Sequence, residues 1–370
     1  MIPVCEPLLT GKELEYVADC LKTNWISSVG KYIAEFENKF ATYCECKHGI
    51  STTSGTTALH LALASLGIGH GDEVIVPAFT MAASVFAVVY TGATPVLVDS
   101  DPETWNMDIA RIEAKVTNKT KAIMPVHIYG HPCDMDPIMK IAGRYNLFVV
   151  EDAAEAHGSE YKGRKAGGIG HIACFSFYAN KIITTGEGGM VVTNDDRIAE
   201  KARRLKDQAY SPGKSFLHTD IGFNYRMTNI QAAIGLAQLE NIGQFVDLRR
   251  QNASHYNAAL RDIPGITLPP EKEWAKNVYW MYSILVGQNF GIGRNELMQK
   301  LRERGVDTRT FFIPMHLQPV FMNMRLFNGE NYPIAEELSE RGLYLPSGSG
   351  LKKEELDYVC NSIREIAALS

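Results

Sequence analysis

Residues 56–195 alternate between short apolar runs and amphipathic segments, and this alternation limits the fold more than any other feature of the chain. The runs EVIVPA, TPVLVD, KAIMPVH, LFVVED, ACFSF and GMVVT have the length of buried strands, and stretches such as TALHLALASLG separate several of them. Buried strands that alternate with helices form a mainly parallel sheet covered by helices on both faces. The sequence therefore predicts an α/β fold whose ligands bind at the carboxyl ends of the strands.

A second, smaller unit follows. A long helical pattern runs from Thr228 to about Leu260, and the break DIPGITLPP then precedes mixed strand and helix patterns. Because 370 residues exceed what one core usually supports, we expect a large domain over residues 1–250, with room for its N-terminal segment to pack on the second unit. A small α+β domain is expected over residues 251–370, and Tyr279, Trp280 and Tyr282 are expected to pack inside it.

Composition excludes several classes of partner. The formal net charge is −5 and no basic run is present, which argues against nucleic acid and anionic membranes. The longest apolar stretch, Ala82 to Tyr90, is far shorter than the roughly 20 residues that span a bilayer. The seven cysteines lie mostly in apolar segments and are expected to be reduced thiols. A cytoplasmic protein without a membrane contact is the resulting expectation.

Two segments of the large domain have the chemistry of a phosphate site and of a charge partner. STTSGTT, residues 51–57, opens a helix, and small residues there leave backbone N–H groups free for an anion. In VVEDAAEAHG, Asp152 ends an apolar strand and could pair with a protonated pyridine nitrogen. Taken singly, each segment is explained as well by a helix cap or by a carboxylate that ends a strand.

Two further segments complete the set. In FSFYANKIITTGEGG, Lys181 follows a buried strand and precedes a glycine-rich turn, and Ser176 could donate to a phosphate. A partly desolvated lysine has a lowered pKa, so it can form an imine and act as a base. In IGFNYRMTNIQ, Asn224 and Arg226 precede a long helix. Together the four segments supply a phosphate cradle, a pyridinium partner, an imine-forming lysine and a polar clamp, which is the set that pyridoxal 5′-phosphate (PLP) requires.

From IPVCEPLLTGKELEYV to its C-terminal helix, the chain resembles the DegT/DnrJ/EryC1/StrS sugar aminotransferases. The resemblance implies the PLP-dependent transferase fold of type I, that of aspartate aminotransferase. It also implies a ping-pong transfer of an amino group from L-glutamate to a nucleotide-linked keto-sugar. The segments WISSVGKYIAEFENKFA, VHIYGHPCDMDPI, NKIITTGEGGMVVTND and GFNYRMTNIQAAIGLAQLE look most like the members that aminate C4 of GDP-4-keto-6-deoxymannose.

By position, the resemblance implies that Lys181 bonds the cofactor and that Asp152 pairs with the pyridine nitrogen. Glu155 would lie beside the ring near its phenolic oxygen, and Gly55, Thr56 and Ser176 would hold the phosphate. The equivalent of Asn224 reaches the phosphate of the neighbouring subunit, which implies a homodimer with shared active sites. Sugar-nucleotide contacts are implied for Trp25, Ile26, Ser27, Ser28, Arg309 and His316.

One position departs from the usual pattern of the family, and three alternative functions stay open. The family usually has an aromatic residue where this chain has Met81, although a thioether can also pack on a ring. Related 3-dehydratases have histidine in place of the lysine, so Lys181 favours amino transfer. The alternatives are a dTDP- or UDP-linked acceptor, a PLP enzyme of amino acids alone, and a PLP-binding protein without turnover. His127, His131 and Cys133 lack a fourth ligand for a metal, so no metal is expected.

Overall fold

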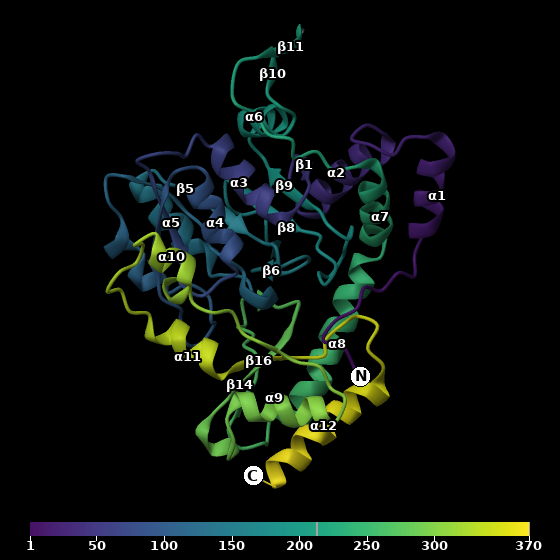
Figure 1. Ribbon diagram of the computed structural model, residues 1–370, viewed down its shortest axis with the longest axis vertical. Helices are drawn as coiled ribbons and strands as arrows, with labels where there is room; N and C mark the ends of the chain where they lie inside the picture. Colours follow the sequence, from purple (N-terminus) through teal and green to yellow (C-terminus); the bar gives the residue numbers. More distant parts are fainter. Residues whose placement is uncertain (212–213, 370) are drawn as a thin grey trace.

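The computed structural model describes residues 1–211 and 214–369. Its centre is a seven-stranded sheet in the order β1-β9-β8-β5-β4-β2-β3 (Figure 1). Strands β8, β5, β4, β2 and β3 are mutually parallel, whereas β9 runs antiparallel to both of its neighbours. The strands are β1 (His48–Thr52), β2 (Glu73–Pro77), β3 (Thr94–Val98), β4 (Thr120–Ile123), β5 (Phe148–Asp152), β8 (Ile172–Ser176) and β9 (Gly189–Thr193).

The antiparallel direction of β9 has a simple cause. A parallel connection needs a crossover, usually a helix, whereas a direct return reverses the chain. Residues 177–188 contain no helix and carry the chain from the end of β8 straight back into β9. This return loop holds Lys181 at the carboxyl end of β8. The predicted α/β fold with a mainly parallel sheet is confirmed.

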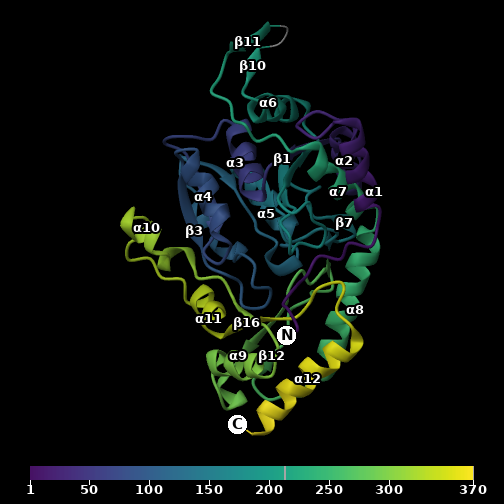
Figure 2. The ribbon, with the colours of Figure 1, turned by 45° about the vertical axis from the view of Figure 1, so that its right-hand side comes forward.

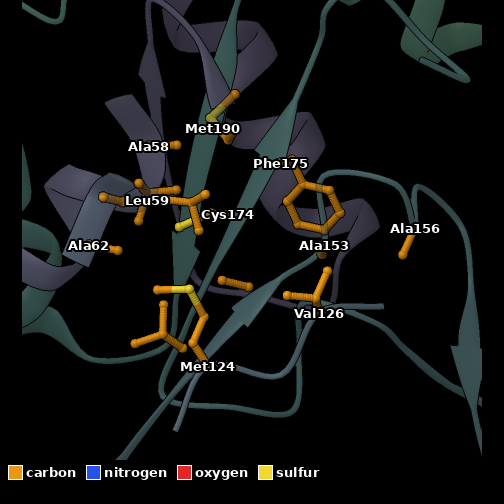
Figure 3. Close-up of a cluster of buried hydrophobic side chains, with 14 of the residues drawn as sticks. Ala58, Leu59, Ala62, Met124, Val126, Ala153, Ala156, Cys174, Phe175 and Met190 are labelled. Carbon is orange, nitrogen blue, oxygen red and sulfur yellow. The ribbon is translucent and has the colours of Figure 1, made fainter. Parts of the chain in front are cut away.

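Helices cover both faces of the sheet because successive strand residues point to opposite sides. Val74 and Val76 pack in one core with α3 and α4, and Figure 3 shows Leu59 and Ala62 of α3 beside Cys174. Ile75 instead packs in a separate core with α5. The helices of this unit are α1 (Glu13–Thr23), α2 (Lys31–Tyr43), α3 (Gly55–Ser65), α4 (Ala82–Tyr90), α5 (Met135–Tyr145), α6 (Asp196–Lys206) and α7 (Asn229–Glu240).

A second unit has its own antiparallel sheet, in the order β12-β14-β16-β15, and its own apolar core. Tyr279 and Tyr282 lie in that core as expected, but Trp280 belongs to the core of the first unit. The long helix α8 runs between the two units (Figure 2). The elements are α8 (Ile242–Leu260), β12 (Ile266–Thr267), β14 (Tyr282–Val286), α9 (Arg294–Glu303), β15 (Arg309–Thr310), α10 (Pro319–Asn323), α11 (Pro333–Arg341), β16 (Gly342–Leu345) and α12 (Lys353–Ala368).

Three smaller features complete the fold. The N-terminal segment joins the second unit, because the N–H of Ile2 donates to the carbonyl of Gly305 at 2.7 Å. A three-stranded sheet joins β6 (Glu160–Tyr161) and β7 (Arg164–Lys165) to β13 (Ala275–Lys276). Strands β10 (Tyr210–Ser211) and β11 (Lys214–His218) pair and project from the body at the top of Figures 1 and 2. Among the described residues, none of the helices has the length and apolar character needed to cross a bilayer.

Candidate active site

A cavity of about 630 Å³ lies where the carboxyl ends of β2, β5 and β8 meet. This volume falls within the range of pockets that hold cofactors and small ligands. The large unit contributes the loops after these strands and the start of α3, and the second unit and the N-terminal segment close the cavity from the other side. Its wall includes Cys5, Gly55, Thr56, Met81, Asp152, Glu155, Ser176, Lys181, Trp280, Asp307 and Arg309.

Lys181 enters the cavity from the loop between β8 and β9. Its side chain is only 10% exposed, and its Nζ lies 3.8 Å from Oε1 of Glu155. The ring of Trp280 lies 3.5 Å from the same nitrogen, measured to its centroid. Burial lowers the pKa of Lys181, and the negative charges of Glu155 and Asp152 oppose that shift. A lysine with a lowered pKa holds more of its amine in the neutral form that attacks a carbonyl.

Asp152 ends β5 on the cavity side of the sheet. Its Oδ2 accepts from Oγ of Ser84 at 2.7 Å, and its Oδ1 accepts from the N–H of Ala154 at 3.2 Å. Burial raises the pKa of this carboxyl, although both hydrogen bonds act in the opposite direction. A buried carboxylate is stabilised by a cationic partner. A protonated ring nitrogen is such a partner, so this position suits a pyridinium.

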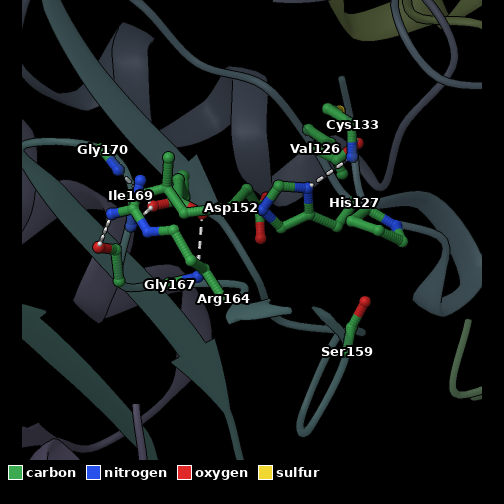
Figure 4. Close-up of polar contacts among 12 residues, drawn as sticks. Val126, His127, Cys133, Asp152, Ser159, Arg164, Gly167, Ile169 and Gly170 are labelled. Carbon is green, nitrogen blue, oxygen red and sulfur yellow. Dashed lines mark hydrogen bonds and ion pairs between the residues drawn. The ribbon is translucent and has the colours of Figure 1, made fainter. Parts of the chain in front are cut away.

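The neighbouring residue of β5 supports this arrangement from the opposite face. Glu151 is fully buried and accepts from the N–H groups of Gly167 and Ile169, each at 2.8 Å, and from Nε2 of His127 at 2.9 Å. The N–H of Cys133 donates to the other ring nitrogen of His127, which is drawn in Figure 4. The backbone N–H of His127 also donates to the carbonyl of Asp152. The polar network therefore holds the strand that carries Asp152.

Glu155 lies in the loop after β5, and its Oε2 accepts from the N–H of Tyr129 at 2.8 Å. Tyr129 has a φ of 54°, a left-handed backbone that is uncommon outside glycine. Such strain is retained where the surrounding structure enforces it, and here it aims an N–H at a buried carboxylate. Burial raises the pKa of Glu155 to about 7, with the nearby Lys181 opposing the shift. Glu155 can thus gain or lose a proton near neutral pH.

The third corner of the cavity suits a phosphate. Helix α3 starts at Gly55, and Ser54 caps it by accepting from the N–H of Thr57 at 3.2 Å. The N–H groups of Gly55 and Thr56 precede the first intrahelical bond and point out of the positive helix end. A Cβ built on Gly55 would lie 2.7 Å from Cβ of Ser176, so only glycine leaves this corner open. The residues present therefore fit a phosphorylated cofactor.

The second unit brings residues that the sequence patterns missed. Trp280 lies against Lys181, and its Nε1 donates to the carbonyl of Asn180 at 2.9 Å. No local pattern marks this tryptophan, because it reaches the cavity only when the second unit packs on the first. Arg309 lines the cavity as expected and pairs with Asp307 at 2.7 Å. Met81 also lines it, and this residue is 53% exposed.

Other predicted site residues lie outside the cavity of their own chain. The segment from Trp25 to Ser28 packs at the start of α7, where Ser27 and Trp25 offer their carbonyls to Asn229. Asn224 is exposed just before that helix, and residues Trp25 to Ser27 are exposed as well. His316 is buried, with its Nε2 2.9 Å from Oε1 of Glu336. None of these residues is among those that line the cavity around Lys181, and Asn224 instead pairs with Asp207 at the end of α6.

A buried lysine, a buried carboxylate at a strand end and an open helix N-terminus around one cavity define a PLP-dependent transferase of fold type I. The chain belongs to the DegT/DnrJ/EryC1/StrS aminotransferase family, which matches residues 7–364. It is a sugar aminotransferase with PLP as its cofactor.

Two relatives and one solved structure illustrate the similarity. The GDP-perosamine synthase of Caulobacter vibrioides is 48% identical over 366 residues, which cover 99% of this chain and 98% of the relative. The GDP-perosamine synthase of Escherichia coli O157:H7 is 50% identical over 364 residues, 98% of each. An aminotransferase from Psychrobacter cryohalolentis is 35% identical, covers 98% of both chains and superposes with a TM-score of 0.93.

Proposed function

We propose that this enzyme transfers an amino group from L-glutamate to C4 of GDP-4-keto-6-deoxy-D-mannose, giving GDP-perosamine and 2-oxoglutarate. The observation that carries the proposal is the identity of 48% and 50%, over 98–99% of the chain, to two relatives named GDP-perosamine synthase. The matched region of 98–99% of the chain includes the return loop and the strand ends that surround the cavity, which supports the proposal for the acceptor as well as for the chemistry.

The proposed roles follow from the position of each group. When bound, PLP supplies an electrophilic carbon and a ring that delocalises the electrons released during amino transfer. Nζ of Lys181 would hold the cofactor and, as a free amine, would accept and return the proton that amino transfer moves. The carboxylate of Asp152 would pair with the protonated ring nitrogen, and Glu155 would hold or give up a proton beside Lys181. The N–H groups of Gly55 and Thr56, together with Oγ of Ser176, bind the phosphate.

We also propose a homodimer with shared active sites. Phe216 and Ile221 are 84% and 90% exposed near the projecting β10–β11 pair, and Trp25 is 55% exposed at the start of α7. Large apolar side chains that are exposed on a single chain can become buried in an interface. Asn224 lies three residues after Ile221 and is exposed as well, so in a twofold dimer it can complete the phosphate site of the partner subunit. Trp25, Ile26, Ser27 and Ser28 would then contact the sugar nucleotide there, opposite Arg309.

Mixing two inactive variants tests the dimer. Lys181→Ala and Asn224→Ala each remove one half of a shared site, so a mixed dimer keeps one complete site. Unfolding and refolding an equal mixture should restore about a quarter of wild-type turnover, because half of the dimers are mixed and each has one active site. No recovery, together with a monomeric mass by light scattering, would refute the shared site.

A cytoplasmic location is part of the same proposal. All seven cysteines are free thiols in the structure, and five of them are buried. Free thiols are typical of a reducing compartment.

The acceptor is tested in two half-reactions. Addition of L-glutamate to the loaded enzyme should remove the absorbance of the lysine-bound cofactor, and the correct keto-sugar should restore it. We expect recovery with GDP-4-keto-6-deoxymannose, with the amino sugar detected by mass spectrometry. Recovery with only a dTDP- or UDP-linked keto-sugar would keep the chemistry and refute the acceptor. A protein that forms no lysine-bound cofactor would refute the function itself.

A further inference from the structure

Arg249, in the middle of α8, is a buried cation that no carboxylate neutralises within the described part of the chain. The residue is 2% exposed, and its recorded partners are all neutral groups. A buried charge is costly unless hydrogen bonds and nearby charges compensate for it. A methionine of similar volume would avoid that cost, so the charge at this position requires an explanation.

The guanidinium of Arg249 joins segments that are far apart in the sequence. Nε donates to Oγ of Ser349 at 3.1 Å, and Nη2 lies 3.3 Å from Sγ of Cys5. Nη1 donates to the carbonyl of Trp280 and, at 3.3 Å, to that of Ser347. The planar fork of an arginine can hold several acceptors in fixed directions, which a lysine ammonium cannot do. One side chain thus ties the N-terminal segment and two segments of the second unit to α8.

Two of these partners lie directly on the active-site cavity. Cys5 lines the cavity, and its Sγ is 3.4 Å from the carbonyl of Asn180. Trp280 donates from Nε1 to that same carbonyl, and its ring lies 3.5 Å from Nζ of Lys181. Cys5 and Trp280 therefore both contact the residue that precedes Lys181, and Trp280 also contacts the lysine itself. The backbone of Trp280 is held from behind by Arg249.

We propose that Arg249 is a positioning residue, whose guanidinium fixes Trp280 and Cys5 against the Asn180–Lys181 segment and places a positive charge behind the amine of Lys181. The inference rests on the proposed role of Lys181 as the cofactor-bonding lysine and is independent of the identity of the sugar. Arg249 acts through its neighbours and does not line the cavity.

The charge of Arg249 shifts the pKa of Lys181 in a definite direction. Burial is the main cause that lowers the pKa of Lys181, and Arg249 lowers it further, whereas Glu155, Asp152 and Cys5 raise it. His157 also faces the amine, but burial lowers the pKa of this histidine to about 3, so the ring stays neutral. Removal of the guanidinium charge therefore raises the pKa of Lys181 and reduces the neutral amine available near pH 7.

Two substitutions separate charge from geometry. Arg249→Met removes the charge, whereas Arg249→Lys keeps the charge but loses the fork. Arg250→Met is the matched control, because Arg250 is the next residue of α8 and pairs with the carboxylate of Glu271. Two quantities are measured from pH 6 to pH 9 on cofactor-free protein. One is the rate at which Lys181 captures PLP, followed by absorbance, and the other is the labelling of Lys181 by trinitrobenzenesulfonate, followed by peptide mass spectrometry.

We expect Arg249→Met to move the midpoint of both pH profiles to higher pH and Arg250→Met to leave them in place. Arg249→Lys should keep the wild-type midpoint but capture PLP several-fold more slowly at every pH, because Trp280 and Cys5 are no longer held. An unchanged midpoint in folded Arg249→Met, or an unchanged rate in Arg249→Lys, would overturn the proposal. If Arg249→Met does not fold, Arg249→Lys decides alone.

The failure of the proposed function would look different. If the Lys181→Ala variant captured PLP as well as the wild-type protein does, the role of the lysine would be refuted. In that case the pH profiles of the Arg249 variants would not test the role of Lys181. Wild-type capture through Lys181, with profiles that Arg249 does not influence, would refute only the positioning role.

Discussion

Two distances at Gly55 give the size of the effect that we expect when this glycine is replaced by alanine. An alanine at position 55 places a Cβ 2.7 Å from Cβ of Ser176 and 3.3 Å from its Cα. Carbon atoms without a bond between them prefer about 3.5–4.0 Å, so α3 and the end of β8 must separate by about 1 Å. Because a backbone atom is involved, rotation of a side chain does not relieve the overlap. Overpacking of this kind costs about 1–3 kcal/mol.

This cost falls on the residues to which we assign the phosphate. At 1.4 kcal/mol for each factor of ten, Gly55→Ala should weaken PLP binding by about 5- to 150-fold. The assay is a titration of cofactor-free protein with PLP, repeated with pyridoxal, which has no phosphate. Binding of pyridoxal should change little, because the displaced groups are the ones that we assign to the phosphate. The ratio of the affinities for PLP and for pyridoxal therefore measures the contribution of the phosphate-binding residues separately from that of Lys181.

Gly143→Ala is the control. Gly143 is exposed in α5, and a Cβ there would meet no heavy atom within 4 Å. Alanine is favoured over glycine by about 0.5–1 kcal/mol inside a helix, so this variant should melt at or above the wild-type temperature and bind PLP normally. A folded Gly55→Ala protein with the wild-type affinity for PLP would refute the assignment of the phosphate to α3 and Ser176.

Three further predictions concern the charged groups of the cavity. Lys181→Ala should abolish amino transfer and leave the melting temperature nearly unchanged, because the amine makes a 3.8 Å ion pair and a contact with the ring of Trp280 in place of a buried hydrogen bond within the described chain; substantial turnover would refute the mechanism. Asp152→Asn should still capture PLP but lose about 100-fold or more in turnover, the size typical of removing one preorganised electrostatic group; turnover within a few-fold of wild type would contradict the pyridinium pair. Glu155→Gln removes a charge that favours the ammonium form of Lys181, and this carboxyl ionises at a pKa of about 7. The pH profile of PLP capture should therefore move to lower pH, opposite to Arg249→Met, and a shift to higher pH would contradict the contact with Glu155.

Much of the fold and part of the site could be predicted from the sequence. Six of the seven strands of the central sheet are short apolar runs, so each was visible in its own segment. The sequence patterns missed β1 (His48–Thr52), because HGIST is not an apolar run. The structure gathers six predicted residues around one cavity, and all of them lie at or soon after the end of a strand: Gly55, Thr56, Asp152, Glu155, Ser176 and Lys181. A parallel sheet places the ends of its strands at one edge, which is why order along the chain was enough to group these residues.

The rest depended on contacts between distant segments. Trp280 was expected inside the second unit, yet its ring lies against the amine of Lys181. Its Nε1 also donates to the carbonyl of Asn180, a residue 100 positions earlier in the chain. Arg249 contacts Cys5 across 244 residues. Neither residue stands in a motif, because a motif records local spacing only. The left-handed backbone of Tyr129 is likewise held by tertiary packing.

The sequence by itself therefore determined the class of fold and the cofactor, because strand periodicity and the chemistry of a lysine, a carboxylate and a helix start are local properties. Only the tertiary structure decided which groups surround the lysine and how strongly its amine holds a proton. That quantity depends on burial and on charges brought close through space, and the second unit provides both when it packs against the first.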